Sequence, residues 1–162
     1  MSIIDLATSI ARPMLSVGCG GNRKYPQRTI RDVNIDITVP TENIPNFVRA
    51  DAQHLPFRDK VFERIHASHI IEHLEDPYAF IRECKRVADT AEILCPHYLD
   101  PNAYIDLDHK HVYWRGGFVR NNPRLQAIAN IIFRNKWIKW ASRKAAGCSR
   151  EVKITLPPTF PQ

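Results

Sequence analysis

The sequence predicts an α/β protein, and three patterns carry that prediction. An apolar run at 14–17 stops at the glycine-rich segment 18–21, as a buried strand does where its backbone turns close to another group. Two more β-like runs follow, and each ends at an acid, Asp36 in one and Asp51 in the other. Residues 76–87 then place apolar side chains at helical spacing, which adds a helix to the strands.

Short strands and loops are expected in the first part of the chain. Residues 2–11 are amphipathic, and the first strand follows at 14–17. Only about a dozen residues separate the glycine segment from the second strand, and Pro26 is among them, which is short for a crossover helix. The first crossover is therefore expected to be abbreviated or missing. Two prolines make 38–45 a loop, and 46–50 is the third expected strand.

Signals for strands and helices are clearer in the middle of the chain than near its end. Asp76 is suited to cap a helix that has Pro77 at its first position. Segment 97–118 is polar and aromatic and is predicted to form a long loop or a hairpin. Residues 124–146 fit either a long amphipathic helix or a strand between loops. The other expected elements are strands at 61–68, 91–95 and 152–156 and a helical turn at 69–74.

In their order along the chain, these motifs resemble a class I S-adenosylmethionine-dependent methyltransferase of the type 11 group. The resemblance covers residues 14–118 and implies a Rossmann-like, mostly parallel sheet with flanking helices. The family usually has seven strands and this chain has room for six, so the C-terminal half is expected to be trimmed. We expect one methyltransferase-like domain over 1–162, with a basic segment at 115–150. The resemblance rests on Leu15–Gly21, Asn34–Asp36, Asp51–Ala52 with Leu55–Phe57, and Ile70–Leu74.

A glycine turn beside two strand-terminal carboxylates suits a nucleoside ligand, with one carboxylate facing the ribose hydroxyls. By the resemblance that ligand is S-adenosylmethionine, with the glycines against its methionine part. Asp36 would then hold the ribose, and Asp51 with the following backbone amide would read the adenine. The residues expected at the cofactor are Ser16, Gly18, Gly20, Asp36, Asp51 and Ala52.

The alternative is a degenerate methyltransferase fold that serves as a non-catalytic binding or structural subunit. Ser16 stands where the family usually has an acid, and Asn22 stands where many members have another glycine. The short first crossover and the trimmed C-terminal half also fit this alternative. Binding of S-adenosylmethionine separates the two interpretations, because an enzyme must bind the cofactor and a scaffold need not.

Histidines gather after the fourth and fifth expected strands, where the resemblance places the catalytic mouth. His69, Glu72 and His73 are spaced i, i+3, i+4, so a helix would place them on one face. They fit a structural brace, or a general base at His69, His73 or His109. They also fit a divalent-metal site of His69, Glu72, His73 and His109.

The Glu72-His73 pair and the Asp108–Trp114 segment are similar to metal-dependent methyltransferases that modify the terminal ribose of small RNAs. Those enzymes carry a carboxylate where His69 stands. We take His69, His73 and His109 as the catalytic candidates and expect a site without a metal.

Positive charge is concentrated near the C-terminus. Residues 115–150 contain nine Lys or Arg and no Asp or Glu, interleaved with aromatic residues. Such a tract can follow a phosphate backbone and stack on bases, or it can be a solvated face around core aromatics. Charge alone favours RNA or another polyanion as the methyl acceptor, and an anionic lipid surface is a further alternative.

Four cysteines without a CxxC pair are typical of buried thiols in a reducing compartment. No apolar run is long enough to span a bilayer, and the N-terminal residues lack a secretory pattern. A cytoplasmic protein is therefore expected.

Overall fold

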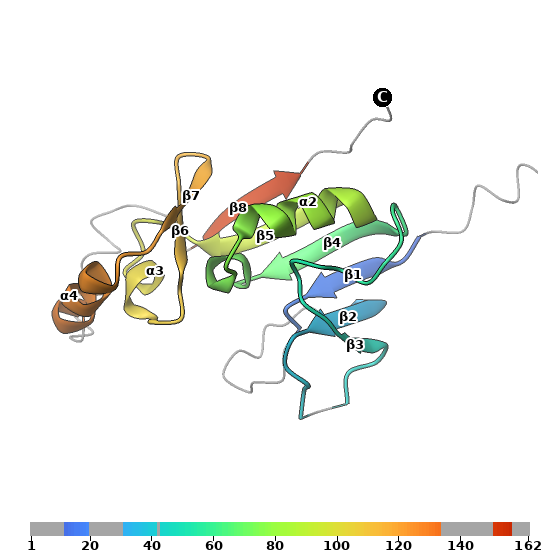
Figure 1. The fold of residues 1–162 in the computed structure, drawn as a ribbon, viewed down its shortest axis with the longest axis horizontal. Helices are drawn as coiled ribbons and strands as arrows, with labels where there is room; N and C mark the ends of the chain where they lie inside the picture. The colour runs from blue at the N-terminus through green and yellow to red at the C-terminus, as the bar shows by residue number, and fades with distance from the viewer. Residues whose placement is uncertain (1–11, 20–30, 42, 134–150, 157–162) are drawn as a thin grey trace, which may run out of the picture.

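The computed structural model describes residues 12–19, 31–41, 43–133 and 151–156. Six of its strands form one sheet in the order β3-β2-β1-β4-β5-β8. All neighbours pair in parallel except β8, which runs antiparallel to β5. This confirms a mostly parallel Rossmann-like sheet (Figure 1). The strands are β1 (Met14–Val17), β2 (Val33–Asp36), β3 (Phe47–Arg49), β4 (Phe62–Ser68), β5 (Ala88–Pro96) and β8 (Glu151–Leu156).

Helix α2 (Pro77–Val87) covers one face of this sheet and lies along β5 (Figure 1). Asp76 caps it as expected, because its Oδ1 accepts hydrogen bonds from the backbone of Tyr78 and Ala79 at 2.9 and 3.0 Å. Phe80, Cys84 and Val87 are spaced along one helical face and are buried in the core. The amphipathic pattern of the helix therefore fixes which face packs on the sheet.

The strands bury their apolar side chains on the α2 side and carry polar ones on the other side. One polar row runs across four strands, because Ser16 pairs with His66 and His66 pairs with Glu92. Thr155 of the edge strand continues this row beside Glu92. Parallel strands that are buried on both faces have unbroken runs of apolar residues in their sequence. The strands of this sheet instead alternate apolar and polar residues.

Beyond the carboxyl edge of the sheet lies a second group of elements that includes a β-hairpin (Figure 1). The hairpin confirms one of the two expectations for 97–118, whereas the short helix before it was not expected. Helix α4 (Pro123–Phe133) agrees with the helical alternative for the first part of 124–146, and the remainder lies outside the described residues. The other elements are η1 (Ile71–His73), α3 (Asn102–Ile105), β6 (His111–Trp114) and β7 (Gly117–Arg120).

The fifth strand begins at Ala88, three residues earlier than expected. Asp89 and Thr90 hid its start in the sequence, yet the backbone already pairs with β4 at Phe62 and Ala88. The expected amphipathic stretch at 2–11 and most of the first crossover lie outside the described residues. Cys19, Cys84 and Cys95 are buried, as the sequence predicted for its cysteines.

Candidate functional site

The glycine turn after β1 needs a residue without a side chain. Gly18 has a φ of +76°, a conformation that L-residues rarely adopt. A Cβ built there would lie 3.1 Å from Cβ of Ile70. The backbone amides of Gly18 and Cys19 both donate to the carbonyl of Ile35, at 2.9 and 3.1 Å. The turn is thus closed against β2, while Gly20 lies outside the described residues.

Both expected carboxylates lie at the same edge of the sheet as this turn. Asp36 is the last residue of β2, and its Oδ1 accepts the backbone N–H of Thr38 at 2.8 Å. Asp51 follows β3, and its Oδ1 accepts the backbone N–H of Gln53 at 2.9 Å. Because β1, β2 and β3 are parallel neighbours, Gly18, Asp36 and Asp51 lie at or just after the carboxyl ends of three adjacent strands.

The local surroundings of this edge favour an ionised carboxylate at Asp51. Burial opposes ionisation, but hydrogen bonds from Gln53 and His54 outweigh it and lower the pKa of Asp51. Ala52 beside it is 4% exposed, and Ser16 on β1 is 3% exposed. Ser16 is therefore a buried residue of β1.

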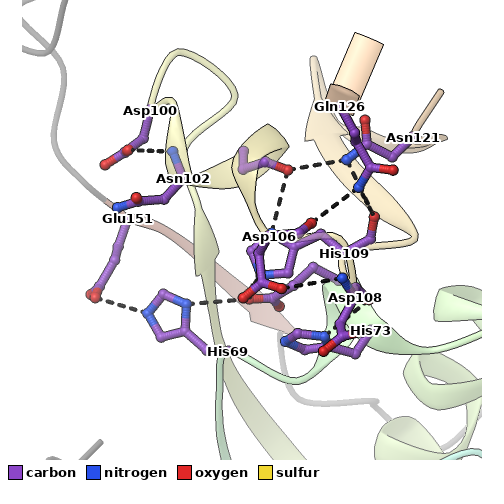
Figure 2. A network of polar contacts seen from close by, with 12 residues as sticks. His69, His73, Asp100, Asn102, Asp106, Asp108, His109, Asn121, Gln126 and Glu151 are labelled. Carbon is purple, nitrogen blue, oxygen red and sulfur yellow. Dashed lines mark hydrogen bonds and ion pairs between the residues drawn. The ribbon is translucent and has the colours of Figure 1, made fainter. Parts of the chain in front are cut away.

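A second polar group lies after β4, centred on the buried carboxylate of Glu72. This side chain is 2% exposed, and its Oε1 lies 3.2 Å from Nδ1 of His69. The other ring nitrogen of His69, Nε2, lies 2.9 Å from Oε1 of Glu151 (Figure 2). The hydrogen bond with Glu72, joined by that with Glu151, raises the pKa of His69 to about 9 despite partial burial. His69 is therefore a cation at neutral pH.

His73 and His109 lie against each other, with ring centroids 4.7 Å apart (Figure 2). Both lie close to Glu72. Nδ1 of His73 lies 3.1 Å from the carbonyl of Asp108, and Nδ1 of His109 lies 3.3 Å from the carbonyl of Ala103. A carbonyl only accepts, so each Nδ1 carries the proton and each Nε2 has the lone pair when the ring is neutral. Burial is the main cause that lowers the pKa of His109, which favours its neutral form.

The loop that carries His109 is held in place from several sides. Its Lys110 amide donates to the carbonyl of Glu72 at 2.8 Å, which ties the loop to η1. Nε2 of Gln126 on α4 donates to the carbonyl of His109 at 2.9 Å, and Nδ2 of Asn121 donates to the same oxygen at 3.2 Å (Figure 2). His109 is thus positioned by contacts from η1 and α4.

The structure brings together some, but not all, of the histidine set that the sequence suggested. Glu72, His73 and His109 each offer one atom, and these atoms lie within 4.8 Å of one another. His69 contacts Glu72 but directs its other nitrogen at Glu151. Sequence reasoning missed Glu151, which had no local signal because only the pairing of Glu151 with Pro96 places it there. It also missed Asp106, whose Oδ2 lies 3.8 Å from Nε2 of His109.

The basic segment is described only as far as Phe133. Within that part, the guanidinium of Arg115 lies 5.6 Å from the ring centroid of Trp114. The guanidinium of Arg120 lies 4.0 Å from the carboxylate of Glu75, so at least one basic side chain of the segment faces an acid. Over the described parts of the chain, no helix is both long enough and apolar enough to cross a membrane.

Comparison with known proteins assigns this architecture. Residues 15–94 match the sequence model of the family described as Methyltransferase domain. None of the curated proteins matches the chain. Among solved structures, a protein from Bacillus halodurans C-125 described as a candidate methyltransferase is 13% identical, with a TM-score of 0.50. That match covers 94% of this chain and 92% of the other, and at this identity it shows the fold.

Two further solved structures align over shorter stretches. The YcgJ protein from Bacillus subtilis is 21% identical with a TM-score of 0.47, and the match covers 66% of this chain and 58% of that one. A chain from the complex of the Haloferax volcanii Trm112 methyltransferase activator with a methyltransferase is 15% identical with a TM-score of 0.42. That match covers 57% of this chain and 50% of the other. The chain thus spans between half and three-fifths of the length of these two proteins.

The family match begins in β1 and ends in β5, so it includes the strands that carry the glycine turn and both edge carboxylates. The fold match extends over nearly the whole chain. Residues 15–94 therefore match the Methyltransferase domain family, and the chain has the Rossmann-like fold of a class I S-adenosylmethionine-dependent methyltransferase.

Proposed function

We propose that this chain transfers a methyl group from S-adenosylmethionine, which it binds across the carboxyl ends of β1, β2 and β3. The observation that supports this most is the placement of Gly18, Asp36 and Asp51 at or just after the carboxyl ends of three adjacent parallel strands. In this proposal the turn at Gly18 lies against the methionine part, where a side chain would obstruct it. Ligands of open α/β sheets bind in this position, outside the carboxyl ends of the strands.

In the proposed complex Asp36 accepts hydrogen bonds from both ribose hydroxyls. A carboxylate has about four lone-pair sites. The hydrogen bond from Thr38 uses one of these sites, on Oδ1. Asp51 and the Ala52 backbone would read the adenine, and the lowered pKa of Asp51 keeps it ready to accept hydrogen bonds. Ser16 and Gly20 complete the proposed set.

The cofactor supplies the electrophile, and the protein has to align the acceptor and assist removal of its proton. Three histidines were candidates for a catalytic base. His69 is a poor proton acceptor at neutral pH, because its two carboxylate partners keep it protonated. His73 and His109 are the better candidates, since each holds an Nε2 lone pair beside Glu72.

The acceptor class remains a proposal drawn from charge. The nine basic residues of 115–150 favour RNA or another polyanion. Trp114 is 42% exposed with Arg115 over its ring, which is an arrangement that suits a stacked base. A single domain over 1–162 and a cytoplasmic location also stay predictions. A non-catalytic subunit with this fold is the second candidate.

Calorimetric titration with S-adenosylmethionine and S-adenosylhomocysteine tests the proposal on the full chain. Asp36→Ala is expected to weaken binding about ten- to a hundredfold, because removal of a charge-assisted hydrogen-bond partner costs about 1.5–3 kcal/mol. Asp59→Ala is the matched control, since Asp59 is an exposed acid paired with Arg86 far from the edge. Unchanged affinity in Asp36→Ala would place the ribose elsewhere. No binding by the unaltered chain would favour the non-catalytic subunit.

A further inference from the structure

We propose that Glu72, His73 and His109 form a binding site for a divalent transition-metal ion. The three residues come from η1 and from the loop before β6, which lie side by side because the Lys110 amide donates to the Glu72 carbonyl. One ligand atom from each lies within 4.8 Å of the others. The proposal stands on this geometry and does not depend on methyl transfer.

Both imidazoles are oriented as metal ligands usually are. The Nδ1–H of each ring donates to a backbone carbonyl, of Asp108 for His73 and of Ala103 for His109. Histidine ligands of metals characteristically donate their second N–H in this way, which fixes the tautomer and aims the other nitrogen. Here that nitrogen is Nε2 in both rings. Each ring thus keeps one nitrogen available to a metal beside the carboxylate of Glu72.

Glu72 provides a buried carboxylate oxygen that has no hydrogen-bond partner among the described residues. Its Oε1 is held by His69, but its Oε2 is buried and makes no hydrogen bond within the described part of the chain. The side chain is 2% exposed, so bulk water reaches it poorly. A buried carboxylate oxygen without a partner is unfavourable, and a cation would compensate it.

A shared proton accounts less well for this arrangement than a metal ion does. Nε2 of His109 lies 4.0 Å from Oε1 of Glu72, which exceeds hydrogen-bond length. Two ligands bound to one ion at about 2.1 Å lie roughly 3–3.5 Å apart, so the three atoms need to move inward by about 1 Å. Side-chain rotation within a rotamer well is enough for that movement.

The ligand types select the class of metal. Two imidazoles and one carboxylate suit Zn²⁺, Co²⁺ and related first-row ions, whereas Mg²⁺ and Ca²⁺ prefer oxygen ligands. Asp106 is the nearest further carboxylate, with Oδ2 at 3.8 Å from Nε2 of His109. His69 is a positioning residue here, because it holds Oε1 of Glu72 and pairs with Glu151. With an ion bound, the Nε2 lone pairs of His73 and His109 are used by the metal, so neither ring serves as the base. An ion with an open position would instead lower the pKa of a bound acceptor hydroxyl.

Cobalt titration of the full, chelator-treated chain tests the site. The unaltered chain is expected to bind one Co²⁺ with the visible absorption of a four- or five-coordinate ion, and Zn²⁺ is expected to displace it while Mg²⁺ does not. His73→Ala and Glu72→Gln should each weaken Co²⁺ binding more than ~100-fold, since loss of an outer-shell partner alone costs about 10- to 100-fold. His69→Ala should show that smaller loss.

His54→Ala is the matched control, because His54 is 84% exposed and lies outside the cluster. It should bind Co²⁺ as the unaltered chain does. Far-ultraviolet circular dichroism checks that each variant is folded. If Glu72→Gln does not fold, His73→Ala decides, because His73 is partly exposed. Absence of saturable Co²⁺ binding, or equal binding by His73→Ala, would overturn the proposal. S-adenosylmethionine titration of the same samples reports separately on the proposed function.

Discussion

Replacement of Gly18 by alanine tests how strongly the fold depends on a glycine at this turn. The backbone there has a φ of +76°, where an L-residue costs about 1–2 kcal/mol relative to glycine. The new Cβ would also lie 3.1 Å from Cβ and 3.2 Å from Cδ1 of Ile70, closer than ordinary van der Waals contact. Crowding of this kind adds roughly 1 kcal/mol. We expect Gly18→Ala to lower the free energy of unfolding by about 2–3 kcal/mol.

A double-mutant cycle with Ile70→Val divides that loss into its two parts. Ile70→Val alone is expected to cost about 0.5–1.5 kcal/mol through the lost methylene. In the Gly18→Ala background it should cost less, because the shorter side chain gives up the Cδ1 contact with the new methyl group. Urea unfolding of the four proteins gives the coupling free energy. If alanine at position 18 leaves the free energy of unfolding unchanged, the positive φ and the Ile70 contact are wrong.

Two other predictions concern charge. The hydrogen bond from Lys153 to Glu92, at 2.7 Å, lowers the pKa of Glu92, and its effect exceeds the opposing effect of burial. This pair therefore stabilises the folded state at pH values above the pKa of Glu92 in the unfolded chain. That stabilisation is lost as pH falls through the lowered pKa of Glu92. The urea midpoints of Glu92→Gln and of the unaltered chain should therefore converge toward acid pH. A difference in midpoint that stays constant with pH would show that ionisation of Glu92 does not stabilise the fold. If the basic segment binds RNA, the log of affinity should fall by about 0.7 per neutralised phosphate per log unit of salt. Charge reversal at Lys136 and Lys139 should reduce that slope. An affinity that does not depend on salt would instead support the interpretation of the segment as a solvated surface.

Sequence patterns were sufficient wherever the determinant is local. Asp76 and Pro77 predicted the start of α2 because capping involves only the next few residues. Asp36 and Asp51 were located because Asp36 ends a short strand and Asp51 comes two residues after one. Helix α3 was missed, since four residues are too few to show a helical period. Its start has a local cause after all, because Asp100 accepts the backbone N–H of Asn102 at 2.8 Å.

The histidine group shows where spacing stops being informative. An i, i+3, i+4 pattern predicts one helical face for His69, Glu72 and His73, but His69 precedes η1 and has a φ of +53°. That backbone turns its ring between Glu72 and Glu151 instead of toward His73. The partner that completes the group, His109, comes from a loop 36 residues later, held by Lys110 and Gln126. Such contacts depend on tertiary structure, which no local pattern encodes.

The edge strand β8 links the register of the sheet to the surroundings of His69. Its side chains alternate between half-buried and exposed, and Val152, Ile154 and Leu156 pack toward the core. The pairing of Pro96 with Glu151 places that carboxylate beside His69. A slip of one residue would turn the apolar set to the polar face and remove Glu151 from His69. The cost of exposing three core-facing side chains therefore holds Glu151 in place. Packing along β8 thus supplies the second carboxylate, after Glu72, that raises the pKa of His69.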